Sequence, residues 1–159
     1  MQIFCYNAYF RDTEIRSKEK MKNIVVDLDG TLTEDIEVKY TDKPVRLDVV
    51  EKLRDYKAMG FNIIISTSRG MRTYNGDIGK INANILPDII TWLDKHNVPY
   101  DSIIVGKAWC GFDGFYIDDK AIRPSEFVRM SYEELQNMLV QEVCHKQKPC
   151  IKNKNKNKK

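Results

Sequence analysis

Two aspartates separated by a single residue stand out as groups that could do chemistry. Asp27 and Asp29 directly follow the apolar run 24–26. Residues two apart on an extended strand point to the same side, so the two carboxylates should lie close together. Adjacent negative charges are costly unless a cation or a shared proton offsets them. The pair therefore favours a cation site, and an ordinary Asx turn before Gly30 is the structural alternative.

Three more apolar runs are followed by polar residues of complementary chemistry. These residues are Ser66, Thr67, Lys107, Asp118 and Asp119. If the runs are parallel strands, their carboxyl ends meet at one edge of a sheet, where such folds place their sites. Carboxylates are the hard ligands that Mg²⁺ prefers, and a hydroxyl and an ammonium suit phosphate oxygens. The combination predicts phosphoryl transfer through an aspartyl-phosphate.

The elements that would position these residues read as an alternating α/β pattern. Short β-branched or aromatic runs, typical of buried parallel strands, occupy 24–26, 63–65, 103–105 and 115–117. Helical periodicity covers 46–59, 85–97 and, after a capping box at 131–134, the residues up to 143. The alternation predicts an α/β fold with a central parallel sheet and helices on both faces.

Composition places the chain among globular proteins. It has 159 residues, 42% hydrophobic and 31% charged, which suits one domain. Its apolar stretches are far shorter than the ~20 residues of a membrane helix, so no membrane partner is expected. The four cysteines match no zinc or redox spacing, and reduced thiols indicate a cytoplasmic protein.

Charge separates the body of the chain from its end. Residues 146–159 contain seven lysines and no acid, so the preceding residues carry a net charge of −4 within an overall +3. An acidic body argues against nucleic-acid binding, and a Lys/Asn tract is typical of a disordered tail. The predicted organisation is an extension at 1–20, one domain at 21–145 and a tail at 146–159.

The polar residues that follow the four apolar runs, taken in this order, resemble the motifs of the haloacid dehalogenase-like superfamily of phosphohydrolases. The resemblance covers residues 22–143. Within this superfamily, the stretches 66–74, 91–101 and 114–124 resemble small bacterial proteins described as capsule-biosynthesis phosphatases. The resemblance implies a Rossmann-like three-layer sandwich without a large cap domain, and dependence on Mg²⁺. It also implies a phosphorylated metabolite as substrate, a sugar phosphate of capsule or surface polysaccharide biosynthesis being favoured.

The resemblance also implies roles for the motif residues. Asp27 matches the nucleophile, and Asp29 matches the acid that protonates the leaving group and then activates water. Thr67 matches the second-motif hydroxyl, with Ser66 as the alternative. Lys107 matches the lysine that neutralises the phosphate and the nucleophile.

A metal site is implied by the same resemblance. Asp27 and the backbone carbonyl of Asp29 match metal ligands, and the pair Asp118 and Asp119 completes the set. In this adjacent-pair form we expect Asp119 to contact Mg²⁺ directly. Ala108 departs from the family pattern, since proline commonly follows the lysine.

Substrate recognition is expected in the Gly-rich stretch after residues 63–65. Arg69, Arg72 and Lys80, together with Ser66, could bind the part of an anionic substrate that is not transferred, while a solvated loop is the alternative. Only about sixteen residues separate the first motif from the next predicted helix, which leaves little room for a cap domain. The site should be open unless another subunit covers it in a homo-oligomer.

Two other functions compete with a metabolite phosphatase. An open site also suits a phosphatase that acts on protein or nucleic-acid ends, and the basic tail favours it slightly. A non-enzymatic receiver domain likewise uses Asp, Thr or Ser, and Lys on a parallel sheet. The Asp27–Thr31 signature and the late acidic pair argue against the receiver.

Overall fold

A computed structural model describes residues 22–145, with side chains through residue 141. The expected extension at 1–20 and tail at 146–159 therefore lie outside the described residues. The chain divides into two compact units, one ending at Ala108 and one beginning at Trp109, and each is described by itself. Among residues 22–145, none of the helices combines the length and the apolar character needed to cross a membrane.

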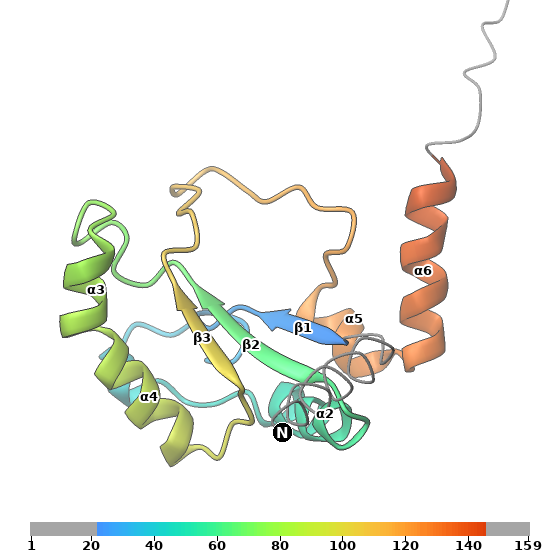
Figure 1. Ribbon diagram of the computed structural model, residues 1–159, viewed down its shortest axis with the longest axis horizontal. Helices are drawn as coiled ribbons and strands as arrows, with labels where there is room; N and C mark the ends of the chain where they lie inside the picture. The colour runs from blue at the N-terminus through green and yellow to red at the C-terminus, as the bar shows by residue number, and fades with distance from the viewer. Residues whose placement is uncertain (1–21, 146–159) are drawn as a thin grey trace, which may run out of the picture. The chain divides into compact units, whose positions relative to one another are not determined.

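The first unit is a parallel three-stranded sheet with connecting helices (Figure 1). Its elements are β1 (Asn23–Val26), η2 (Tyr40–Asp42), α2 (Leu47–Ala58), β2 (Asn62–Thr67), α3 (Ile78–Asn84), α4 (Leu86–Lys95) and β3 (Ser102–Val105). The order is β1-β2-β3, and both pairs are parallel. The α/β class, the first three predicted strands and the helices predicted at 46–59 and 85–97 are thus confirmed.

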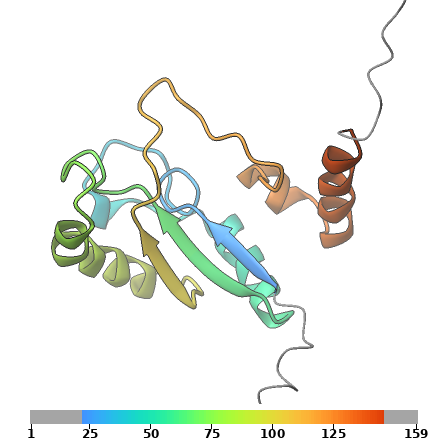
Figure 2. The ribbon, with the colours of Figure 1, turned by 45° about the horizontal axis from the view of Figure 1, so that its top comes forward.

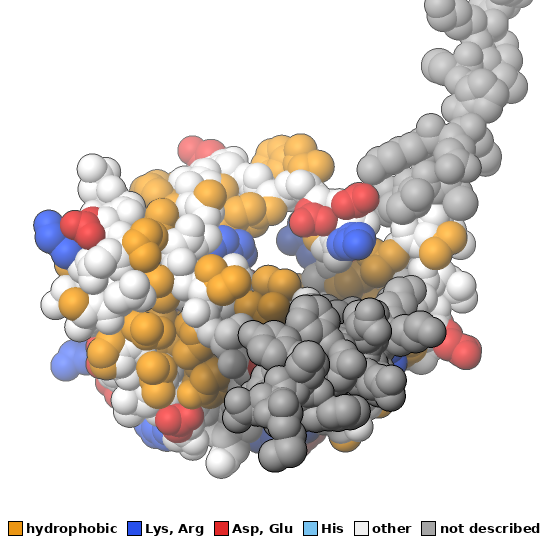
Figure 3. Space-filling view, viewed as in Figure 1, with side chains coloured by type: hydrophobic (Ala, Val, Ile, Leu, Met, Phe, Trp, Pro, Cys, Tyr) orange, Lys and Arg blue, Asp and Glu red, His pale blue; other side chains and the backbone are white. Residues whose placement is uncertain are grey.

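The register aligns the carboxyl ends of the strands. Val26 pairs with Ile65, and Thr67 pairs with Val105, so the residues after each strand emerge at one edge (Figure 2). Val26, Ile65 and Thr67 share a buried face of the sheet. Val25 and Ile104 lie on the opposite face and are exposed, and Figure 3 shows hydrophobic side chains in view where Figure 1 draws β3.

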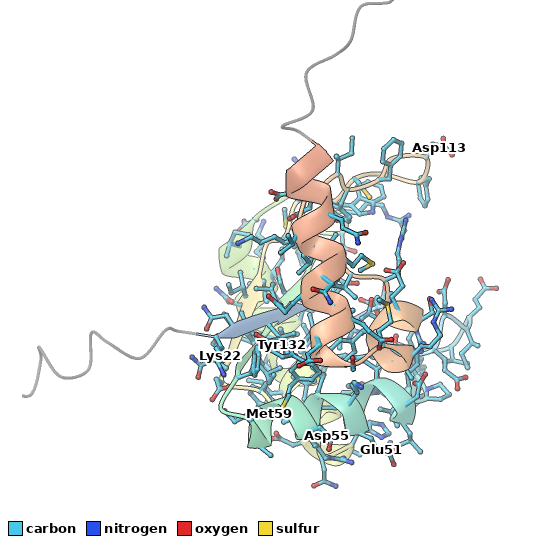
Figure 4. The ribbon with its side chains drawn as sticks, turned by 90° about the vertical axis from the view of Figure 1, so that its right-hand side faces the viewer. Lys22, Glu51, Asp55, Met59, Asp113 and Tyr132 are labelled. Atoms are coloured by element: carbon cyan, nitrogen blue, oxygen red, sulfur yellow. The ribbon has the colours of Figure 1, made fainter. Side chains whose placement is uncertain are left out.

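Helices α2 and α4 contribute much of the core of this unit. In α2 the buried residues are those of the predicted stripe, Val49, Val50, Leu53 and Tyr56, and α4 contributes Ile89 and Leu93 of its predicted stripe together with Trp92. Fully burying one such side chain stabilises the fold by about 1.5–3 kcal/mol. Figure 4 shows Glu51, Asp55 and Met59 along the other, exposed side of α2. Gly60 follows the helix with a φ of +84°, a conformation that glycine adopts without strain.

Helix α3 was not predicted, because the segment that precedes and begins it is rich in glycine. Gly79 lies inside the helix and lowers its intrinsic stability. The Asp77 side chain compensates by capping the first turn, accepting a hydrogen bond from the Lys80 backbone amide at 3.1 Å. Consequently Lys80, expected in a loop, belongs to a helix.

The second unit contains α5 (Pro124–Arg129) and α6 (Tyr132–His145). Helix α5 was also not predicted. The capping box before α6 is confirmed: the Ser131 amide donates to Glu134 Oε2 at 2.7 Å, and the Glu134 amide donates to Ser131 Oγ at 3.3 Å.

The fourth predicted strand, at 115–117, is wrong. These residues form no strand, and Phe115 and Ile117 are 75% and 89% exposed. The runs at 24–26, 63–65 and 103–105 are as short, but they pair with one another, whereas no strand of the described sheet pairs with 115–117 to supply ladder hydrogen bonds. In the described residues the segment is an extended loop between Gly114 and Asp118.

Candidate active site

The loop after β1 is anchored by buried leucines between the polar residues. The carbonyl of Leu28 accepts hydrogen bonds from the amides of Leu32 and Thr33 at 2.9 and 3.0 Å. Leu28 and Leu32 are fully buried. Gly30 has a φ of +75°, which closes the turn. The loop thereby holds Asp27 and Asp29 at the rim, with side chains 28% and 31% exposed.

Lys107 reaches the first of these carboxylates. Its Nζ donates to Asp27 Oδ1 at 3.0 Å, although the two residues are 80 positions apart. The Lys107 amide also donates to the Thr67 carbonyl at 3.1 Å, which ties the residue after β3 to the end of β2. The structure thus brings together two of the predicted site residues through the parallel register.

The electrostatic setting of Asp27 differs from that of a surface carboxyl. Burial raises the pKa of the Asp27 carboxyl above its ordinary 3.8, and the neighbouring charge of Asp29 adds to the rise. The hydrogen bond and charge of Lys107 offset this effect only in part. The carboxylate is therefore undercompensated in this unit, and a further cation would stabilise it.

Arg69 contacts the second carboxylate at both oxygens. Its Nε donates to Asp29 Oδ2 at 3.0 Å, and its Nη2 donates to Oδ1 at 2.7 Å. Such two-point contacts are among the strongest side-chain hydrogen bonds. The guanidinium expected to bind substrate is thus engaged with Asp29, and its predicted role toward substrate stays a prediction.

Lys43 and Tyr40 complete this cluster, and the sequence did not indicate either residue. Lys43 Nζ lies 3.8 Å from Asp29 Oδ1. The Tyr40 ring lies 4.4 Å from the Arg69 guanidinium carbon and 5.4 Å from Lys43 Nζ. Trp92 Nε1 donates to the Lys43 carbonyl at 2.8 Å, which holds the segment against α4. In the sequence these residues sit in an unremarkable polar segment, so no local signal marks them.

Thr67 and Ser66 lie on opposite sides of β2. Thr67 is on the buried face, and its Oγ1 accepts a hydrogen bond from the Arg69 amide at 3.0 Å. Ser66 is half-buried on the other side. A hydroxyl carries one donor besides its acceptor sites, so the Thr67 hydroxyl can still donate a hydrogen bond to a phosphate oxygen.

The remaining predicted substrate residues are exposed. Arg72 lies in the turns that follow β2, and Lys80 lies in α3 with its Nζ 3.5 Å from Asp77 Oδ2. Their roles toward substrate stay predictions.

Asp118 and Asp119 belong to the second unit. Both are exposed, and Asp118 Oδ1 accepts a hydrogen bond from the Lys120 amide at 2.7 Å. Among the side chains described, those of residues 22–141, no three His, Cys, Asp or Glu come together as a ready metal site. The first unit alone nevertheless offers the Asp27 carboxylate and the Asp29 carbonyl. Such hard donors fit Mg²⁺, which commonly uses one or two carboxylates with water and phosphate.

The chain is similar in sequence and in structure to a protein of known structure. That structure is the crystal structure of a structural-genomics target from Vibrio cholerae, 58% identical in sequence, with a TM-score of 0.76. The match covers 77% of this chain and 99% of that chain. The chain belongs to the same family as this Vibrio cholerae protein.

The description of that family member names no activity or ligand. No family model matches the chain, and no curated protein matches it. The function is therefore inferred from the residues of the site.

Proposed function

We propose that the chain is a Mg²⁺-dependent phosphatase that hydrolyses a phosphomonoester through an aspartyl-phosphate at Asp27. The 3.0 Å contact between Lys107 Nζ and Asp27 Oδ1 carries the proposal. It sets a carboxylate nucleophile beside a fixed ammonium at the carboxyl edge of a parallel sheet, where a phosphate could be bound. As part of the proposal, the fold is a haloacid dehalogenase-like three-layer sandwich without a large cap.

In the first step, a carboxylate oxygen of Asp27 attacks the phosphorus. The bond between Asp27 and phosphorus forms while the bond from phosphorus to the leaving oxygen breaks. Asp29, which enters this step protonated, gives its proton to that oxygen and becomes a carboxylate, so the dephosphorylated product leaves as an alcohol. Lys107 and the Thr67 hydroxyl offset charge on the phosphate oxygens.

In the second step, water attacks the phosphorus of the aspartyl-phosphate. Asp29 now accepts the proton from this water, and the bond between phosphorus and Asp27 breaks. Inorganic phosphate leaves, and both carboxylates return to their starting states. One pair of carboxylates, two residues apart, therefore serves both half-reactions.

Asp27 and the Asp29 carbonyl would hold Mg²⁺, which when bound neutralises charge on the phosphate oxygens. Assignment of further ligands to Asp118 and Asp119, with Asp119 contacting the metal directly, is part of the proposal. The hard oxygen donors of this set support the choice of Mg²⁺.

The proposed substrate is a phosphorylated small metabolite, with a sugar phosphate of surface-polysaccharide biosynthesis favoured. The resemblance of the stretches 66–74, 91–101 and 114–124 to capsule-biosynthesis phosphatases supports this class. A cytoplasmic location is also proposed, because the four cysteines match no zinc or redox spacing and reduced thiols are typical of the cytosol.

A phosphate-release assay over three substrate classes tests the proposal. Sugar phosphates, phosphopeptides and 3′-phosphorylated oligonucleotides would each be offered with Mg²⁺ and with EDTA. We expect multiple turnovers on sugar phosphates, loss with EDTA and recovery on adding Mg²⁺. Turnover confined to peptides or oligonucleotides would replace the substrate class, and a single stoichiometric phosphorylation without turnover would indicate a receiver.

Lys107→Ala should abolish this activity. Lys95→Ala is the matched control, because Lys95 is an exposed lysine at the end of α4. Full activity in Lys107→Ala would contradict the proposed site.

A further inference from the structure

The Asp29 carboxylate is oriented by a buried guanidinium rather than by solvent. Both oxygens accept hydrogen bonds from Arg69, at 3.0 and 2.7 Å, and the Arg69 side chain is only 2% exposed. We infer that Arg69 is a positioning residue that fixes the plane of the Asp29 carboxylate, and that Tyr40 acts through Arg69. This inference rests on the proposed function for its kinetic consequence, since Asp29 is there the proton donor and acceptor.

The geometry of the contact explains why a guanidinium suits this task. A single hydrogen bond leaves a carboxylate able to rotate about its terminal torsion, whereas two parallel bonds from a planar fork define its plane. Lys43, at 3.8 Å, adds charge as a single point and cannot define that plane. The orientation of Asp29 therefore depends on Arg69.

Arg69 is itself held at two points. Its backbone amide donates to Thr67 Oγ1 at 3.0 Å, which ties the residue to the end of β2. The Tyr40 ring lies 4.4 Å from the guanidinium carbon, a cation–π contact made by a residue of η2. Tyr40 thus contacts Arg69, which contacts Asp29, and the three side chains form a chain of contacts to the proposed proton-transfer group.

The kinetic test separates positioning from substrate binding. Arg69→Ala should lower kcat for an alkyl phosphate roughly 10- to 100-fold, since small misplacements of a reacting group cost that much. KM should change little. With an aryl phosphate, whose leaving group needs no proton, the variant should accumulate phosphate on Asp27 because the water is poorly activated. A raised KM with unchanged kcat and no accumulation would mean that Arg69 binds substrate, and would overturn the inference.

Two further variants keep the test decisive if Arg69→Ala folds poorly. Arg69→Lys keeps the charge but loses the two-point contact, so it should show the same defect, and full activity in it would overturn the inference. Arg54→Ala is the matched control, because Arg54 Nη2 donates to the Asn97 carbonyl at 3.0 Å and contacts neither aspartate. It should behave as the unsubstituted chain.

A double-mutant cycle tests the role of Tyr40. Tyr40→Leu should lower kcat by roughly 2- to 5-fold, as expected for loss of one cation–π contact, and Tyr40→Phe should not. In the Arg69→Ala background, Tyr40→Leu should add nothing, because both changes act on the same contact. An equal effect of Tyr40→Leu in both backgrounds would show that Tyr40 does not act through Arg69 but through Lys43 or the substrate, against the inference.

A measurement that does not depend on activity distinguishes failure of the positioning inference from failure of the proposed function. In ¹⁵N-labelled protein, the Arg69 Nε proton should exchange slowly with water, and Asp29→Asn and Tyr40→Leu should each speed its exchange. Fast exchange in the unsubstituted chain would overturn the positioning inference whatever the activity. Slow exchange in a chain that hydrolyses no phosphomonoester would support the positioning of Asp29 while contradicting the proposed function.

Discussion

At the scale of single residues, the side chains of Asp27 and Asp29 are identical but have different surroundings. Asp27 pairs with the single ammonium of Lys107, whereas Asp29 is held by the fork of Arg69. Different surroundings give identical side chains different chemical tasks. A nucleophile needs one oxygen free to attack, and a proton-transfer group needs a defined orientation, which agrees with the proposed division of roles.

Substituting each aspartate separately should expose these roles. Asp29→Asn keeps the nucleophile but lacks the base that activates water, a contribution of typically ~10²–10⁴-fold. Given an aryl phosphate, it should accumulate a phosphoryl adduct on Asp27, visible by intact-mass measurement after rapid quench and located by peptide mapping. Asp27→Asn should form no adduct, and an adduct on Asp29 in that variant would reverse the two assignments.

At the scale of elements, β2 is tied to the residues that flank β3 by a specific contact at each end. The Ile63 amide at the start of β2 donates to Asp101 Oδ2 at 2.7 Å, just before β3. The Lys107 amide, just after β3, donates to the Thr67 carbonyl at the end of β2. The register that these contacts hold determines where Lys107 emerges.

The Asp101 carboxylate should make stability depend on pH at the acid end. Its hydrogen bond from Lys57, and then that from the Ile63 amide, hold the pKa of Asp101 below its ordinary 3.8. A depressed pKa stabilises the fold above that ordinary value, and the contribution disappears as the pH falls through the lower, folded-state pKa. Asp101→Asn should therefore destabilise the chain at pH 7.

The exposure of Asp101 and Lys57 limits the size of this loss of stability. Both partners are more than a third exposed, so the loss should stay below about 1 kcal/mol. Urea unfolding at pH 7 and near pH 3 would measure it, and a difference that persists unchanged at the lower pH would exclude the carboxylate charge as its source. Asp55→Asn, a change on the exposed side of α2, serves as the control.

Gly106 links backbone conformation to function. Its φ of +93° costs a side-chain-bearing residue about 1–2 kcal/mol, and an added Cβ would lie 2.6 Å from Ile78 Cδ1. Ile78 is partly exposed and can move, so Gly106→Ala should fold, but with Lys107 displaced. We expect lower thermal stability and a clear fall in kcat.

Gly60→Ala is the matched control for Gly106→Ala. Gly60 has a similar φ of +84°, nothing lies within 4 Å of an added Cβ, and it is far in the sequence from Lys107. The thermal stability of Gly60→Ala should fall by an amount similar to that of Gly106→Ala, while its kcat stays unchanged. Equal loss of kcat in the two variants would mean that general destabilisation, and not the placement of Lys107, lowers activity.

At the scale of the whole molecule, the relationship to the Vibrio cholerae protein covers 77% of this chain. The motif residues from Asp27 to Asp119 all lie between the expected extension at 1–20 and the basic segment at 146–159. A globular unit can keep its activity without terminal segments that contribute nothing to its core or its site.

We therefore expect a shortened chain of residues 21–145 to fold and to keep its kcat on small phosphate esters. Circular dichroism and steady-state kinetics on the short and full chains would check this. A large loss of kcat with intact folding would show that one of the removed segments completes the site.

The local sequence was sufficient to predict those elements whose physical cause is a short or repeating pattern of apolar residues. Apolar runs and helical stripes predicted β1, β2, β3, α2 and α4, because burial of one face dictates the spacing of apolar residues. The same pattern predicted that Asp27 and Lys107 would meet, since parallel strands end at one edge. The run 115–117 shows the limit of this reasoning, because three apolar residues form a strand only where a neighbour pairs with them.

The cluster around Asp29 was decided by the tertiary structure alone. Arg69 was expected to face substrate, and Lys43 and Tyr40 carried no motif, yet all three gather around one carboxylate or its partner. Contacts between side chains far apart in the chain depend on how loops pack, here through the bond from Trp92 to the Lys43 carbonyl. Spacing along the sequence determined which chemical groups are present at the rim, and packing in three dimensions determined which of them touch.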